Sequence, residues 1–152
     1  MANPRSTVQI FGHPIHPVLI PFPIACLVGT LASDIVYRST GDDFWALGAY
    51  WLLAAAIVMA ALAALAGLID FLSEPRIRAL SAAWYHLLGN VTAVVLSLIN
   101  FWLRYQDGIA AYPTALWISL VVVVLLLFNG WMGWELVYKH RVGIADDLPI
   151  GG

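Results

Sequence analysis

Long apolar segments alternate with short polar ones along the whole chain, and this pattern predicts four membrane spans. A helix needs about 20 mainly apolar residues to cross a hydrocarbon core about 30 Å thick. The segments that satisfy this requirement are residues 17–37, 45–72, 84–105 and 114–138. The polar segments between them read "RSTGDD", "SEPRIRALS" and "QDGIAAYP". We therefore expect an all-α integral membrane four-helix bundle that forms a single transmembrane domain over residues 1–152.

The composition agrees with a chain surrounded by membrane lipid. Hydrophobic residues make up 62% of the sequence and charged residues only 11%, whereas a soluble domain is typically about 45–50% apolar. The net charge is −2 and no basic block is present, so nucleic acid is not expected as a partner. The only cysteine, Cys26, lies in an apolar segment and is expected to be a small packing residue.

The distribution of lysine and arginine predicts the orientation. Positive charge is concentrated in the loops that face the cytoplasm. Five basic residues lie on the N-terminal side of the predicted membrane and two on the other; they are Arg5, Arg76, Arg78, Lys139 and Arg141 against Arg38 and Arg104. Both termini are therefore predicted to be cytoplasmic. No sequence repeat is evident, although a two-plus-two arrangement of the spans stays open.

The motif "GHPIHP" (12–17) begins the first span in an unusual way. Prolines at 14, 17, 21 and 23 each lack an N–H donor and clash with the preceding helical turn. A regular helix that began only after Pro23 would be about 21 Å long up to Tyr37, too short to cross the membrane. The proline segment is therefore predicted to enter the membrane as broken backbone, and to hold two imidazoles against the ends of the other helices.

All four histidines are predicted to lie at one membrane face. They are His13, His16, His86 and His140. Asp70, Glu135 and Asn90 are expected within about one helical turn of the same level. Imidazole suits zinc, copper and iron, including haem iron, and glycines 67, 89 and 133 could leave room for a macrocycle. The four histidines are thus candidate metal ligands, with Asn90, Asp70 and Glu135 in support, although which pair would ligate is left open.

The same residues also allow a simpler interpretation. Histidines at helix ends commonly act as caps or bind lipid headgroups. Asp70 and Glu135 could form ion pairs with Arg76, Arg78 or Lys139 at the membrane surface. Asp34 and Arg38, one helical turn apart, are predicted to form an ion pair on a helix surface.

Several segments resemble the bacterial DUF2231 family of small four-helix membrane proteins. They are "FGHPIHPVLIPFPIACLVGTLASDIVY", "AGLIDFL", "HLLGNVTAVVLSLINFWLR" and "GWELVYKHRVGI". The family pattern has histidines where this chain has its four, an asparagine at Asn90, and acids at Asp34 and Asp70. Trp134 and Arg141 stand where the family usually has glycine. The resemblance implies a multi-pass protein of the bacterial inner membrane. Because some relatives are fused to Rieske-type or cytochrome-like modules, it also implies membrane redox chemistry.

Three functions follow as hypotheses. The first is a redox module that binds haem b or a non-haem Fe, Cu or Zn ion and exchanges electrons with quinone or a redox partner protein. The second is a proton or metal-ion transport or sensing protein, and the third a structural or assembly subunit, in a homo-oligomer or a larger complex, without a cofactor. HExxH, GxSxG and phosphate-binding glycine loops are absent from the sequence, so a hydrolytic enzyme is the weakest option.

Overall fold

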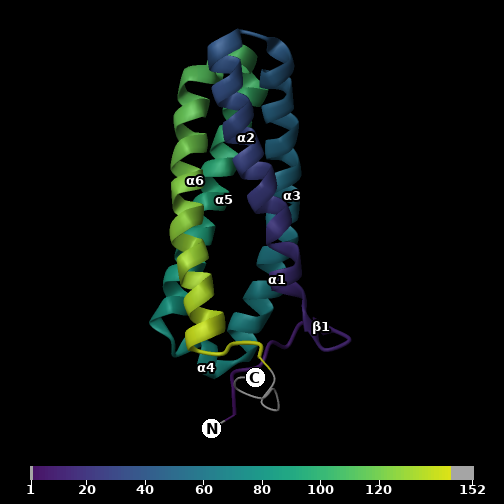
Figure 1. Cartoon of the computed structure of the whole chain (residues 1–152), viewed down its shortest axis with the longest axis vertical. Helices are drawn as coiled ribbons and strands as arrows, with labels where there is room; N and C mark the ends of the chain where they lie inside the picture. The colour runs from purple at the N-terminus through teal and green to yellow at the C-terminus, as the bar shows by residue number, and fades with distance from the viewer. Residues whose placement is uncertain (1, 145–152) are drawn as a thin grey trace, which may run out of the picture.

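The computed structural model describes residues 2–144, and these form an almost entirely helical protein (Figure 1). Two antiparallel strands of two residues each come first, and helices follow up to Lys139. The elements in order are β1 (Gln9–Ile10), β2 (His13–Pro14), α1 (Ile15–Leu19), α2 (Pro21–Thr40), α3 (Asp43–Ser73), α4 (Pro75–Arg78), α5 (Ser81–Asp107), the 3₁₀-helix η1 (Gly108–Ala111), α6 (Tyr112–Trp134) and the π-helix η2 (Glu135–Lys139).

Three helical stretches of the described chain are long and apolar enough to cross a membrane: Ile15–Thr40, Asp43–Ser73 and Ser81–Lys139. The third contains 59 residues, because the 3₁₀-helix η1 follows α5 directly and leads into α6. Gly108 at the start of η1 has a positive φ of 54° and turns the chain there. Helices α5 and α6 then run side by side (Figure 1). Four long helices, α2, α3, α5 and α6, therefore form the bundle, and the expectation of an all-α membrane protein is confirmed.

The bundle consists of two helical hairpins that face each other. Helix α2 packs along α3 and α5 packs along α6, while α2 contacts α6 and α3 contacts α5. Small side chains allow close packing in the interior, and Ala49, Ala56 and Ala115 are completely buried. Many large apolar side chains point outward instead, including Trp51, Leu127 and Trp131. This distribution is expected in lipid, where helices associate through close packing rather than through the exclusion of water.

The two hairpins are equivalent under an approximate two-fold relation. Buried positions of α2 become buried positions of α5 when 70 is added to the residue number. A second constant shift in residue number relates the buried positions of α3 to those of α6 in the same way. The equivalent buried pairs are Pro23 and Ala93, Leu27 and Ser97, Thr30 and Asn100, and Asp34 and Arg104 in the first helices, and Ala49 and Ala115, Leu53 and Ser119, Ala56 and Val122, and Ala63 and Asn129 in the second. The helix contacts obey the same relation, because exchanging the hairpins turns the α2–α6 contact into the α5–α3 contact. The two-plus-two arrangement is thus present.

The first span contains a break, but the break is smaller than the prolines predict. Helix α1 already begins at Ile15, two residues before Pro17, and the helical assignment is interrupted only at Ile20. Ile20 keeps helical dihedrals, with φ −53° and ψ −40°. Pro21 and Pro23 fall at the start of α2, where a missing N–H donor disturbs the helix least. The proline segment is therefore a short helix joined to a long one.

Candidate functional site

His16 and His86 meet between the two hairpins. Their ring centres are 6.1 Å apart and the ring planes are almost perpendicular, at 89°. His16 lies on α1 and His86 near the beginning of α5, and both are half-buried. The two residues are 70 positions apart, so they are equivalent under the relation between the hairpins. Two imidazoles from different halves of the chain are thus brought together across the approximate two-fold axis.

Each imidazole is held by the second helix of its own hairpin in the same way. His16 Nδ1 lies 2.7 Å from the carbonyl oxygen of Ala63 on α3, and His86 Nδ1 lies 3.0 Å from that of Asn129 on α6. A carbonyl oxygen can only accept a hydrogen bond, so each Nδ1 carries the proton. In the neutral ring Nε2 then has a free lone pair, and within residues 2–144 neither Nε2 has a hydrogen-bond partner. This is the tautomer that binds a metal ion through Nε2.

A glycine one turn after each carbonyl makes room for the ring. A methyl group on Gly67 would lie 2.8 Å from His16 Nδ1, and one on Gly133 would lie 3.3 Å from His86 Cε1. A side chain at Gly67 would therefore displace the imidazole, and one at Gly133 would press against it. The sequence predicted that Gly67, Gly89 and Gly133 leave room for a macrocycle. In the structure the space at Gly67 and Gly133 is occupied by the histidine rings, and the space at Gly89 by the Asn129 side chain.

Two asparagines surround His86. Asn90 Nδ2 donates to the backbone carbonyl of His86 at 2.8 Å, and its Oδ1 lies 3.4 Å from Asn129 Nδ2. Asn90 thus supports the helix that carries His86 and does not bond the imidazole. Asn129 Oδ1 packs against Gly89 and is buried without a hydrogen-bond partner in the described part of the chain. An unpaired buried amide oxygen is costly, and here it lies beside the histidine pair.

The other two histidines lie apart from this pair. His13 is exposed, and its Nδ1 donates to the carbonyl of Phe11 at 3.0 Å. His140 lies 3.9 Å from the Glu135 carboxylate. Among the described residues, no group of three or more His, Cys, Asp or Glu side chains could hold a metal ion. The structure therefore brings together two of the four predicted ligands.

Asp70 binds the N-terminal segment of the chain. One carboxylate oxygen accepts hydrogen bonds from the Thr7 amide (2.6 Å), the Thr7 hydroxyl (2.9 Å) and the Val8 amide (2.9 Å). The other oxygen accepts from the Ser6 hydroxyl at 2.7 Å. Within the described chain, none of the ion pairs involves Asp70, so the predicted alternative of an arginine or lysine partner is wrong for this residue.

Glu135 forms the surface ion pair that was one of its two predicted alternatives. Its carboxylate lies 2.5 Å from Lys139 Nζ, one turn further along η2. The lysine side chain is well exposed, so this contact adds little stability.

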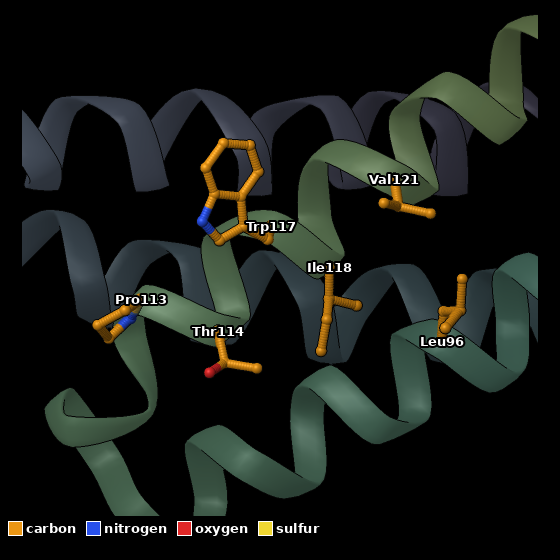
Figure 2. A pocket seen from close by; sticks show the side chains of 6 residues that line it. All are labelled: Leu96, Pro113, Thr114, Trp117, Ile118 and Val121. Carbon is orange, nitrogen blue, oxygen red and sulfur yellow. The ribbon is translucent and has the colours of Figure 1, made fainter.

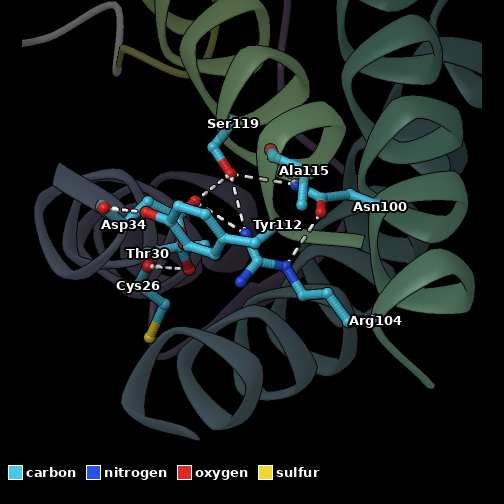
Figure 3. Close-up of polar contacts among 8 residues, drawn as sticks. All are labelled: Cys26, Thr30, Asp34, Asn100, Arg104, Tyr112, Ala115 and Ser119. Carbon is cyan, nitrogen blue, oxygen red and sulfur yellow. Dashed lines mark hydrogen bonds and ion pairs between the residues drawn. The ribbon is translucent and has the colours of Figure 1, made fainter. Parts of the chain in front are cut away.

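A second polar centre occupies the opposite end of the bundle (Figure 3). Asp34 is fully buried, and Arg104 Nη2 contacts its Oδ2 at 2.6 Å. The Ser119 hydroxyl donates to the same oxygen at 2.7 Å, and the Tyr112 hydroxyl donates to the Asp34 backbone carbonyl. Arg104 Nε also donates to Asn100 Oδ1 at 2.9 Å. The predicted surface pair of Asp34 with Arg38 is therefore wrong: Arg38 is exposed, and the partner of Asp34 comes from the other hairpin.

Two spaces among the described residues lie away from the histidine pair. A void lined by Thr30, Ser97, Asn100 and Ser119, together with Leu27, Leu53 and Val122, is too small to hold a water molecule. A larger hollow of about 350 Å³ lies on the outer surface between α5 and α6 (Figure 2). Its lining is apolar apart from Thr114, so it offers no metal ligand.

Sequence reasoning missed the buried ion pair and the role of Asn129. The spacing between polar residues is the signal that could have found the ion pair. His16 and Asp34 are separated by the same number of residues as His86 and Arg104, so if the two histidines meet, the two charged residues lie at matching levels. That interval corresponds to about 27 Å of helix. It places one polar pair at each end of the bundle.

Comparisons with known proteins give the family of the chain. Searches of curated proteins and of solved structures found no match. The family model described as "Predicted membrane protein (DUF2231)" matches residues 12–146. The resemblance read from the sequence is thereby confirmed, and the chain belongs to the DUF2231 family of predicted membrane proteins.

Proposed function

We propose that the protein is a membrane electron-transfer module that binds a b-type haem through His16 and His86 at its cytoplasmic face. The observation that carries the proposal is the pairing of two imidazoles, one from each hairpin, with both Nδ1 atoms bound to backbone carbonyls. Haem needs only two axial ligands from the protein. When bound, it would supply one-electron transfer between quinone or a redox protein and the module.

The separation of the rings fits two ligands of one metal ion. A metal–imidazole bond is about 2 Å long and each ring centre lies about 1 Å behind its nitrogen, so two rings that bound one ion would have centres about 5–6 Å apart, according to the angle between the two bonds. The observed distance is 6.1 Å.

The protein would contribute orientation and electronic tuning. Carbonyl oxygens of Ala63 and Asn129 hold each ring in the Nδ1–H tautomer, which makes Nε2 the more basic ligand atom. Gly67 and Gly133 let the rings approach the second helices closely. Ala63 on α3 and Ala93 on α5 are small and buried.

Other cofactors fit the site less well. A structural zinc site takes four protein ligands, whereas only two come together in the described chain. Copper or non-haem iron would need ligands beyond the two histidines as well, or an unusually low coordination number. Transport is also less well supported, because the void within the bundle does not admit water.

The test is the visible spectrum of the detergent-purified protein from haem-supplied cells, oxidised and then reduced with dithionite. We expect a Soret band that shifts on reduction, and its loss in both His16→Ala and His86→Ala. His13→Ala and His140→Ala are matched controls, since they remove the same side chain at the same end of the protein, and both should keep the band.

Two results would contradict the haem proposal. One is a spectrum without a Soret band, in which case metal analysis for copper, iron and zinc would decide between the remaining cofactors. The other is equal haem loss in all four variants, because this would mean that the His16–His86 pair has no special role.

A further inference from the structure

The two halves of the histidine pair are supported differently. His86 lies within α5, an uninterrupted helix of 27 residues. His16 lies on α1, which has five residues and is separated from α2 at Ile20. Pro21 and Pro23 have no N–H to donate to the preceding turn, so α1 is joined to α2 by fewer hydrogen bonds than a continuous helix provides. The position of His16 therefore depends on contacts outside its own helix.

Those contacts come from a strap formed by residues 6–8, which connects α1 to Asp70 on α3. The strap donates four hydrogen bonds to the Asp70 carboxylate. The carbonyl of Val8 in turn accepts a hydrogen bond of 3.0 Å from the amide of Ile15, the first residue of α1 and the neighbour of His16. Helix α1 is thus attached to α3 twice, through the strap to Asp70 and through His16 Nδ1 to Ala63.

Within residues 2–144, the second hairpin has no such attachment. The position of α6/η2 equivalent to Asp70 is Leu136, which packs into an apolar cluster with Phe71, Ile77 and Ala83. At this pair of positions the approximate symmetry between the hairpins is therefore broken. An acid replaces an apolar residue on the side where the helix that carries the histidine is short and interrupted.

We propose that Asp70 is a positioning residue for His16: through the strap of residues 6–8 it holds α1 in place, so that His16 is the ligand that can be released while His86 stays bound. The proposal rests on the proposed haem function. In this proposal a coordination position opens when His16 is released. The release depends on the Asp70 carboxylate, which does not touch the imidazole ring.

The experiment compares Asp70→Asn with Glu135→Gln in the haem-loaded protein. Glu135→Gln is the matched control, because it neutralises an acid at the same end of the other hairpin without touching the strap. Carbon monoxide binds reduced haem only where an axial position is open. We expect a carbon monoxide difference spectrum in Asp70→Asn and none in the wild type or in Glu135→Gln. Added imidazole competes for the open position and should raise the carbon monoxide concentration needed for half-saturation.

A second measurement does not need haem. Thr7 and Val8 amides donate directly to Asp70, and a hydrogen bond to a charged group has a net strength that corresponds to about a ten- to hundredfold change in an equilibrium. Their hydrogen exchange should therefore accelerate by about that factor in Asp70→Asn and stay unchanged in Glu135→Gln. Thr7→Ala, which removes one donor at 2.9 Å, should give a smaller effect of the same kind on both measurements.

The outcomes separate the two proposals. Haem binding in the wild type with no carbon monoxide binding in Asp70→Asn or Thr7→Ala would overturn the positioning role and leave the haem proposal intact. Loss of haem from Asp70→Asn without faster exchange at Thr7 and Val8 would overturn it too, because the strap would not be the connection. Absence of haem from the wild type refutes the proposed function, and the positioning of a ligand falls with it.

Discussion

The buried ion pair between Asp34 and Arg104 gives the most direct test of the structure. We consider Arg104→Met, which keeps most of the side-chain volume and removes the charge. Asp34 is 0% exposed and Arg104 7% exposed, so the change leaves a carboxylate buried without its counter-ion. One carboxylate oxygen, Oδ1, already has no hydrogen-bond partner within the described residues.

The expected cost is large because an unpaired charge in a low-dielectric interior is strongly unfavourable. Removing one partner of a buried pair typically costs about 3–5 kcal/mol. For a protein of this size, that change lowers the melting temperature by about 6–20 °C. Replacing both charges, as in Asp34→Leu combined with Arg104→Met, removes the unpaired charge and is expected to restore much of the loss.

The assay is thermal unfolding in detergent, followed by circular dichroism, for the single variants and the double variant. Arg38→Met is the control. It removes the same charge one turn from Asp34, but from an exposed side chain, and should change the free energy of unfolding by less than about 0.5 kcal/mol. Equal destabilisation by Arg38→Met and Arg104→Met would refute the cross-hairpin pair, and so would a double variant as unstable as Arg104→Met alone.

Two further substitutions test packing and hydrogen bonding in the same assay. Gly67→Ala should destabilise the protein by about 1–3 kcal/mol, because the new methyl group pushes His16 off the Ala63 carbonyl and leaves the Nδ1–H of His16 without an acceptor. Gly130→Ala, where a methyl group meets no described atom within 4 Å, should instead stabilise it by up to about 1 kcal/mol; equal effects at the two glycines would contradict the close packing of His16. Tyr112→Phe should cost about 1 kcal/mol through loss of the hydrogen bond to the Asp34 carbonyl, and an unchanged melting temperature would show that this bond does not stabilise the fold.

Much of the architecture was predictable because a membrane restricts the structures that can cross it. Backbone polar groups must be satisfied within each segment in lipid, so an apolar run of sufficient length becomes a helix. Each predicted span corresponds to one of the four long helices. The parity of those spans also places His13, His16, His86 and His140 at one end of the molecule. Figure 1 shows α1, β1, α4 and the yellow end of α6 together at that end.

The pairing of polar side chains was not predictable in the same way. Asp34 and Arg38 have the spacing of an ion pair within one helix, yet Asp34 is buried against Arg104. Sequence spacing describes neighbours on one helix face, whereas the choice of partner depends on which faces the hairpins turn toward each other. The same limit applied to the four histidines, of which only His16 and His86 approach each other.

The sequence by itself thus determined the membrane class, the four helices and the end of the bundle at which the histidines lie, since these follow from hydrophobic length and from counting spans. Tertiary structure alone decided which residues meet. Packing two equivalent hairpins about a common axis brings positions 70 residues apart together, so one histidine pair and one ion pair form across that axis. Interactions across the axis depend on helix rotation and crossing, and a linear pattern of apolar and polar residues does not contain that information.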